Sequence, residues 1–281
     1  RLIMLRQRVI TGVLLALAFL AAVYFLRLEA LAIIFGGVAA AAAWEWSGLS
    51  GIKSVPVKVL YTLTYMGLLM ATWAALAIGE APAPDVFQPW LGTACFFWSV
   101  VMLMVESYPG TAWIWRSRMS RAVFGLFILT TTWLSTIFLL TMPSGTVLLV
   151  LMVLAVALAD IGAYFAGRRW GRHKLAIRVS PGKTWEGFWG GVVSVVVLTC
   201  VVAYMLPQHM AHLSLVTLIL LGLAVAGASV LGDLTVSMVK RESGVKDSGT
   251  LLPGHGGLLD RIDGLCAAAP VFGLGLLLAG Y

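Results

Sequence analysis

Charged side chains are scarce in this chain of 281 residues, because Asp, Glu, Lys and Arg together make up 11% of the sequence. Soluble domains carry about 25% charged and roughly 45–50% apolar residues. This chain is 60% apolar, with a mean hydropathy of +0.97. So few charges cannot cover a globular surface in water. The composition therefore excludes a soluble enzyme, a disordered chain and a nucleic-acid-binding domain, and it predicts that lipid surrounds most of the protein.

Cysteine is also scarce. Cys95, Cys200 and Cys266 lie singly in apolar runs, without a CxxC pair. This spacing excludes a disulfide framework and a thiolate metal site, so we expect three small, buried apolar side chains. The sequence also lacks internal repeats and inverted pairs of broken spans, which many transporters contain.

Long apolar runs are abundant. A helix needs about 20 apolar residues to cross the ~30 Å hydrocarbon core of a bilayer. The first run is long enough to span, no A-x-A cleavage site follows it and further spans do, so we expect an anchor rather than a signal peptide. The runs predict an all-α polytopic membrane protein with about nine transmembrane helices. Their approximate ranges are 9–26, 29–45, 58–78, 90–105, 122–141, 145–166, 187–206, 213–237 and 260–280.

The basic residues predict the direction of these spans. If the N-terminus is cytoplasmic, 18 of the 19 Lys and Arg residues fall in cytoplasmic segments, and Arg27 falls outside. The loop 79–89 on the other side contains no Lys or Arg. Because cytoplasmic loops of membrane proteins carry an excess of basic residues, we expect a cytoplasmic N-terminus and an external C-terminus. The same rule explains the net charge of +7 without a nucleic-acid partner.

The acidic residues are concentrated in the second half of the chain. We divide the protein into residues 1–141, with about five spans, and residues 142–281, with about four spans and the cytoplasmic loops 167–186 and 238–259. The second half holds seven of the twelve carboxylates. An ionisable residue inside a span costs at least ~2.5–3.5 kcal/mol, so it normally faces a partner or a water-filled site. For Asp160, a simple helix-to-helix hydrogen bond or salt bridge is an equal alternative.

The densest polar segment reads SMVKRESGVKDSGTLLPGHGGLLDRID, residues 237–263. Asp260 and Asp263 are three residues apart, so a helix that begins there places both on one face. The glycine-rich loop before them can fold backbone N–H groups around an anion, and Lys and Arg bind phosphate oxygens. Carboxylates beside phosphate are typical ligands of Mg²⁺, as in phosphoryl and nucleotidyl transfer. A stripe on the preceding helix is formed by Asp233, Ser237 and Lys240.

A second cluster, RVSPGKTWEG at residues 178–187, contains a GKT tripeptide. A Walker A motif needs a glycine five positions before Gly182, where this chain has Ile177, and no strand is expected before it, so a P-loop is excluded. A basic loop beside a membrane helix can still bind a triphosphate or a lipid phosphate; the alternative is an ordinary positive-inside loop. In the polar segment 237–263, His255 is a candidate base or a hydrogen-bond donor to phosphate. The alternative is a loop histidine whose hydrogen bonds are satisfied within the protein.

These motifs resemble those of the phosphatidate cytidylyltransferase (CDP-diacylglycerol synthase) family. Residues 237–263 meet every specified position of the pattern S-x-x-K-R-x4-K-D-x-G-x3-P-x-H-G-G-x2-D-R-x-D, and SPGKTWEG and the A-D-x-G-A-Y segment at 159–164 are also similar. The resemblance implies transfer of CMP from CTP to phosphatidic acid, giving CDP-diacylglycerol and pyrophosphate in phospholipid biosynthesis. It implies Mg²⁺, with K⁺ as a candidate second ion. It also implies a homodimer in the bacterial cytoplasmic (inner) membrane, with the active site facing the cytoplasm and no nucleic-acid partner.

The match assigns roles to individual residues. The metal ligands are Asp233, Asp260 and Asp263. The catalytic residues are Lys240, Arg241, Lys246, Asp247 and His255. The substrate-binding residues are Asp160, Ser180, Lys183, Thr184, Ser237, Gly256, Gly257 and Arg261.

The mechanism that we expect is direct attack of the lipid phosphate on the α-phosphorus of CTP. Because that phosphate is already anionic, no protein nucleophile is needed, and Ser237 is a hydrogen-bonding residue or a substrate contact. Two alternatives stay open at this point. A CTP-dependent polyprenol kinase would transfer the γ-phosphate to an alcohol, and an ion-coupled transporter would use Asp160 and Asp233 as an ion path.

Overall fold

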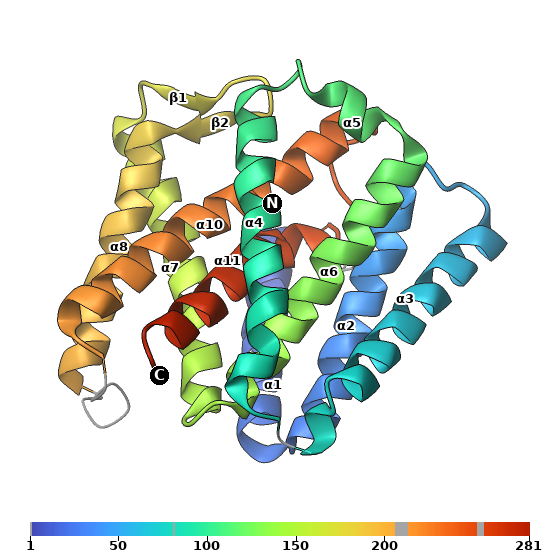
Figure 1. Ribbon diagram of the computed structural model, residues 1–281. Helices are drawn as coiled ribbons and strands as arrows, with labels where there is room; N and C mark the ends of the chain where they lie inside the picture. The colour runs from blue at the N-terminus through green and yellow to red at the C-terminus, as the bar shows by residue number, and fades with distance from the viewer. Residues whose placement is uncertain (1, 81, 206–212, 252–255) are drawn as a thin grey trace.

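The computed structural model describes every residue except 1, 81, 206–212 and 252–255, and it describes side chains from residue 12 onward. Apart from one short hairpin, the described chain is a bundle of long helices (Figure 1). The long helices are α1 (Leu2–Phe25), α2 (Leu28–Leu49), α3 (Val55–Ala75), α4 (Gln88–Glu106), α6 (Arg118–Thr141), α7 (Gly145–Trp170), α8 (Trp185–Met205), α10 (Leu215–Glu242) and α11 (Leu259–Leu278). The short elements are the 3-10 turns η1 (Ile78–Glu80) and η2 (Pro84–Phe87), the helix α5 (Ala112–Arg116), and the strands β1 (Lys174–Ala176) and β2 (Ser180–Thr184).

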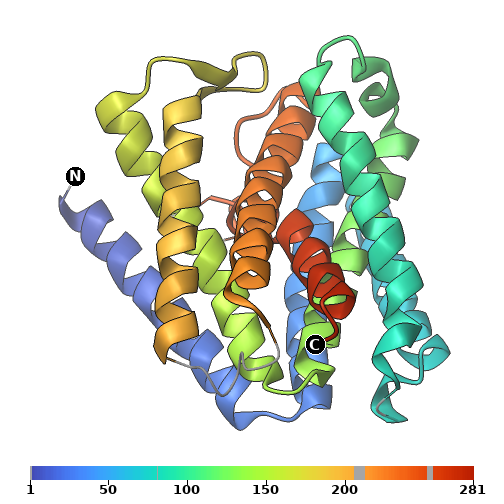
Figure 2. The same ribbon diagram turned by 60° about the vertical axis from the view of Figure 1, so that its left-hand side comes forward.

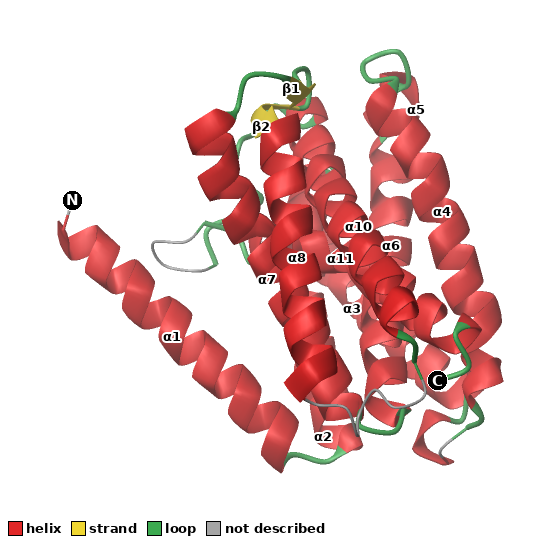
Figure 3. Cartoon of the chain, turned by 90° about the vertical axis from the view of Figure 1, so that its left-hand side faces the viewer, coloured by secondary structure: helices red, strands yellow, loops and turns green. Residues whose placement is uncertain are grey.

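Eight of the expected spans coincide with helices that are long and apolar enough to cross a membrane. The agreement is close, since the range 122–141 corresponds to α6 and the range 260–280 to α11. The first expected span corresponds to α1, whose apolar described part, Gly12–Phe25, is shorter than a span. In Figure 3, α1 leans away from the rest of the bundle. The architecture is therefore that of an all-α polytopic membrane protein, while the count of nine spans and their direction stay predictions.

Bulky aromatic side chains hold the middle of the bundle together. Trp46 of α2 is fully buried, and its indole N–H donates to the carbonyl of Arg121 on α6 at 2.7 Å. The indole N–H of Trp133 on α6 donates back to the carbonyl of Ala32 on α2 at 3.1 Å. These bonds use helix carbonyls, so the indoles of Trp46 and Trp133 are satisfied without water. They fix α2 against α6, and α11 packs on the same α6.

The β1–β2 hairpin differs from the structure expected from the sequence. We expected no strand before the GKT tripeptide in the loop 167–186, but residues 180–184 form β2, which pairs antiparallel with β1 in the register Lys174↔Thr184 and Ala176↔Ser180. A strand therefore does precede the GKT tripeptide, and the exclusion of a P-loop depends on Ile177 alone. Figure 2 shows the hairpin at one end of the bundle, where it connects α7 to α8.

The cysteines are free, as expected, but they are not all buried. Cys266 is buried and Cys95 is half-buried, whereas Cys200 is exposed on α8. An exposed side chain on a membrane span meets lipid rather than water, so an apolar run does not tell an inward-facing position from an outward-facing one.

Candidate active site

The site begins where α10 crosses α11. A Cβ atom at Gly232 of α10 would overlap the backbone carbonyl of Asp263 on α11, so only glycine allows this approach. Close contact through small residues is typical of helices packed in lipid. The contact brings Asp233, the next residue of α10, beside Asp263, and the two carboxylates are electrostatic neighbours.

Two lysines neutralise part of this acidic cluster. Lys183 of β2 forms an ion pair with Asp233 at 2.5 Å, and Lys240 of α10 forms one with Asp260 at 2.7 Å. The Lys240–Asp260 pair is well shielded, with each side chain 13% exposed. Asp160 of α7 interacts electrostatically with Lys183 and Asp233, although its side chain is exposed. The carboxylate cluster thus consists of Asp160, Lys183, Asp233, Lys240, Asp260 and Asp263.

The cluster has the composition of a cation site, with four carboxylates and two lysines. Within the described ranges, however, no group of three or more His, Cys, Asp or Glu side chains is arranged to hold one metal ion. Asp233 is paired with Lys183 and Asp260 with Lys240, and Asp263 interacts electrostatically with Asp233. Mg²⁺ is usually held by one or two carboxylates together with substrate phosphates and waters. The oxygen chemistry of Asp233 and Asp263 is of the kind that suits Mg²⁺.

Asp260 also organises the loop that precedes α11. Its second carboxylate oxygen accepts hydrogen bonds from the backbone N–H groups of Ser248 at 2.9 Å and Gly257 at 3.3 Å. The N–H of Gly257 is therefore already used inside the protein. Gly256 has a φ of +84°, a left-handed conformation that favours glycine. The two glycines that we assigned to substrate binding thus shape the turn into α11.

Glu45 of α2 is a buried site residue that the sequence analysis missed. Its side chain is 4% exposed, and it accepts hydrogen bonds from the Ser248 hydroxyl at 2.9 Å and from the N–H groups of Leu258 at 3.1 Å and Leu259 at 2.9 Å. A carboxylate in this position satisfies free N–H groups at the start of α11 and interacts favourably with the helix dipole. One signal in the sequence could have identified Glu45, because it is an acidic residue at the end of the expected span 29–45.

Some residues in and near the β1–β2 hairpin reach the carboxylate cluster, and others stabilise the local structure. Lys183 reaches the cluster, whereas Thr184 is buried and its hydroxyl accepts from the Gly187 N–H at 3.2 Å, as an N-cap residue of α8 does. Ser180 lies half-buried on β2. Arg241 of α10 points to the hairpin, where its Nε donates to the carbonyl of Val179 at 3.3 Å. This bond ties the end of α10 to the turn just before the strand that carries Lys183.

The remaining predicted residues are placed as follows. The Ser237 hydroxyl donates to Asp233 at 3.2 Å, so this serine belongs to the cluster. Lys246, Asp247 and Arg261 are exposed. His255 lies outside the described residues.

A second polar network stabilises the end of α10 next to Lys240. The Tyr108 hydroxyl donates to Glu242 at 2.8 Å, and Arg116 lies 3.8 Å from the same carboxylate. Desolvation, and then the hydrogen bond to Glu242, raise the pKa of Tyr108 above its ordinary value. The buried Arg121 donates to the Ser243 hydroxyl at 2.9 Å. These contacts fix α10 to the connection between α4 and α6.

Comparison with known proteins agrees with this arrangement. The sequence pattern that defines the cytidylyltransferase family matches residues 6–278. The phosphatidate cytidylyltransferase of Pseudomonas aeruginosa is 39% identical over 279 residues, which cover 99% of both chains. The enzyme of the same name from Haemophilus influenzae is 36% identical over 281 residues, covering 96% of this chain and 97% of the relative. Because the match extends over almost the whole chain and includes the segments that form the carboxylate cluster, this protein belongs to the cytidylyltransferase family.

Proposed function

We propose that this protein transfers CMP from CTP to phosphatidic acid, producing CDP-diacylglycerol and pyrophosphate. The observation that carries the proposal is the meeting of Asp233 and Asp263 with Lys183 and Lys240 where α10 crosses α11. Both substrates are phosphate anions, which lysine binds as a compact charge. Family membership indicates the nucleotide, and helices long and apolar enough to cross a membrane are consistent with a lipid substrate.

In the proposed reaction, an oxygen of the lipid phosphate attacks the α-phosphorus of CTP. The bond from that phosphorus to the oxygen of the β-phosphate breaks, and pyrophosphate leaves. Transfer of this kind depends mainly on positioning and on electrostatic stabilisation. Lys183 and Lys240 exchange their carboxylate partners for phosphate oxygens when the substrates bind. Ser237, whose hydroxyl is directed to Asp233, positions that carboxylate and forms no covalent intermediate.

The proposal includes Mg²⁺ at Asp233 and Asp263. The support is the chemistry of the cluster, in which two lysines do not balance four carboxylates. When bound, Mg²⁺ would neutralise negative charge on the reacting phosphates. Asp260 keeps a different task, because it holds Lys240 before the substrates bind and accepts hydrogen bonds from the loop before α11. K⁺ as a second ion rests on the family resemblance alone.

The proposed location is the bacterial cytoplasmic membrane, with the cluster facing the cytoplasm, the N-terminus inside and the C-terminus outside. The distribution of Lys and Arg supports this orientation, and the relatives named above are bacterial. A homodimer remains a proposal that depends on the family resemblance.

Incubation of the purified protein with phosphatidic acid, Mg²⁺ and CTP tests the reaction. CTP is labelled separately at the α- and γ-phosphates. The proposal expects the α-label in a chloroform-soluble product and the γ-label in pyrophosphate. The γ-label in lipid when a polyprenol is offered would instead establish a kinase. Absence of lipid labelling by folded protein would refute both and favour a transporter.

A further inference from the structure

Glu186 joins the two sides of the β1–β2 hairpin at its base, where α7 leads into β1 and β2 leads into α8. It is the acidic residue of the segment RVSPGKTWEG, and the proposed reaction does not use it. From the first turn of α8, its carboxylate accepts hydrogen bonds from the backbone N–H groups of Arg172 at 3.0 Å and His173 at 3.2 Å. The ring nitrogen Nδ1 of His173 lies 2.7 Å from the same carboxylate. One side chain therefore closes the base of the hairpin.

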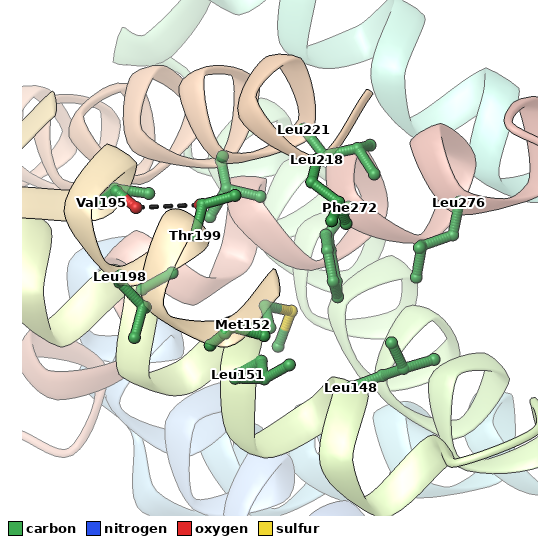
Figure 4. A pocket seen from close by; sticks show the side chains of 14 residues that line it. Leu148, Leu151, Met152, Val195, Leu198, Thr199, Leu218, Leu221, Phe272 and Leu276 are labelled. Carbon is green, nitrogen blue, oxygen red and sulfur yellow. Dashed lines mark hydrogen bonds between the residues drawn. The ribbon is translucent and has the colours of Figure 1, made fainter. Parts of the chain in front are cut away.

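The start of α8 is held in place by close packing of its helix. The buried Val195 of α8 lies in one apolar cluster with Val156 of α7 and Val225 of α10. The cavity left between these helices and α11 is about 60 Å³, far below the ~300–1,000 Å³ that is typical of ligand pockets. Figure 4 shows the side chains that line it, among them Leu198 of α8 and Met152 of α7. Because α8 is closely packed, Glu186 attaches the hairpin to a fixed point.

Lys183 lies on β2 between two attachments of the hairpin. It is three residues before Glu186, and its ammonium group forms the ion pair with Asp233. Beyond the other end of β2, the bond from Arg241 to the carbonyl of Val179 ties the turn of the hairpin to α10. A lysine carries a point charge on a flexible stem. The position of its strand therefore decides how often the ammonium group meets a carboxylate or a phosphate at the cluster.

We propose that Glu186 is a positioning residue for CMP transfer, which keeps the ammonium group of Lys183 beside Asp233 by closing the base of the hairpin. The inference rests on the proposed function and extends it to a carboxylate outside the cluster. Glu186 acts as a hydrogen-bond acceptor, and it neither binds the metal nor transfers a proton. An amide in its place keeps one acceptor oxygen for the backbone N–H groups, and its NH₂ group can donate to the neutral ring of His173.

Three substitutions separate positioning from the other roles of a carboxylate. Glu186→Ala removes every hydrogen bond of this side chain, and we expect it to lower kcat/KM for CMP transfer by about tenfold. Glu186→Gln should stay within about threefold of the wild type, because the amide keeps the hydrogen bonds. Glu106→Ala is the matched control at an exposed carboxylate at the end of α4, and it should retain the wild-type rate. A loss in Glu186→Gln as large as that in Glu186→Ala would overturn the proposal, since it would show that the charge itself is needed.

A double-mutant cycle tests whether Glu186 acts through Lys183. Lys183→Met removes the ammonium group and keeps most of the apolar stem. In that background, Glu186→Ala should lower kcat/KM by less than about twofold, because no ammonium group is left to position. An equal loss in both backgrounds would give Glu186 a general structural role and contradict the proposal.

The reactivity of the Lys183 amine reports its position without turnover. Lys183 is 23% exposed and paired with Asp233, so acetic anhydride should modify it about twofold or more faster in Glu186→Ala than in the wild type. The exposed Lys246 is the internal reference, and peptide mass spectrometry gives both rates. Unchanged reactivity of Lys183 would refute the positioning role.

A milder variant keeps the proposal testable if Glu186→Ala does not fold. His173→Ala removes the ring contact of an 80% exposed side chain and keeps the backbone bonds to Glu186. It should raise the reactivity of Lys183 by a smaller factor, and no increase would count against the proposal. Absence of CMP transfer by the folded wild type would instead refute the proposed function, since the labelling rates do not depend on turnover.

Discussion

The carboxylate of Glu45 gives the sharpest test of how the site is held together. It accepts three hydrogen bonds, from the Ser248 hydroxyl and from the N–H groups of Leu258 and Leu259. Glu45→Gln keeps the shape of the side chain but replaces one acceptor oxygen with an NH₂ group. If the remaining oxygen keeps the hydrogen bonds from Ser248 and Leu259, the N–H of Leu258 loses its acceptor. It then faces the new NH₂ group, which is itself a donor.

The expected cost follows from this geometry. Leaving one buried donor unsatisfied costs about 1–3 kcal/mol, and removing a negative charge from a helix N-terminus costs about 0.3–1 kcal/mol more. Because each 1.4 kcal/mol is about a factor of ten in an equilibrium, local opening at the start of α11 should become about tenfold or more frequent. Hydrogen exchange of the backbone amides around Leu258 and Leu259 measures this opening.

The control for this variant is Glu29→Gln, on the same helix. Glu29 is exposed in the first turn of α2, so its substitution should leave exchange at the start of α11 unchanged. Glu45→Gln should also lower the rate of CMP transfer, since the loop that it loosens is bound to Asp260. Unchanged exchange at Leu258 and Leu259 in Glu45→Gln would refute the reasoning.

Three further predictions concern the carboxylate cluster. Asp263→Asn should lower kcat by about 10²–10³-fold, the usual effect of removing one electrostatic group from an active site, whereas the exposed Asp85→Asn should retain wild-type rates in the α-label assay. Gly232→Ala should destabilise the protein by about 1–3 kcal/mol, because overpacking forces α10 away from α11. Gly227→Ala on the same helix should not destabilise the protein, because a Cβ atom at Gly227 meets nothing within 4 Å. Thermal unfolding in detergent compares the two variants. Equal stability of the two would contradict the close contact at Gly232. Removal of divalent ions with EDTA should abolish CMP transfer and added Mg²⁺ should restore it; transfer that survives EDTA would exclude the proposed ion.

The sequence by itself determined the membrane architecture. A span is a local property, since about 20 consecutive apolar residues are enough to predict it, and this is why eight expected ranges coincide with long apolar helices. The start of α11 next to Asp260 was equally local. The motif in residues 237–263 also indicated the family, because many fixed positions in a short segment carry more information than composition does.

Only the tertiary structure decided which of these residues work together. Glu45 and Ser248 are 203 residues apart, and the Lys183–Asp233 pair joins a hairpin to a distant helix, so no local pattern could connect either pair. The hairpin itself was missed because two short polar strands have no apolar periodicity. The close crossing at Gly232 depends on which face of α10 meets α11, and uniformly apolar helices do not encode that face in their hydropathy. Hydrophobicity placed the helices in the membrane, whereas close packing and the pairing of buried charges placed the site.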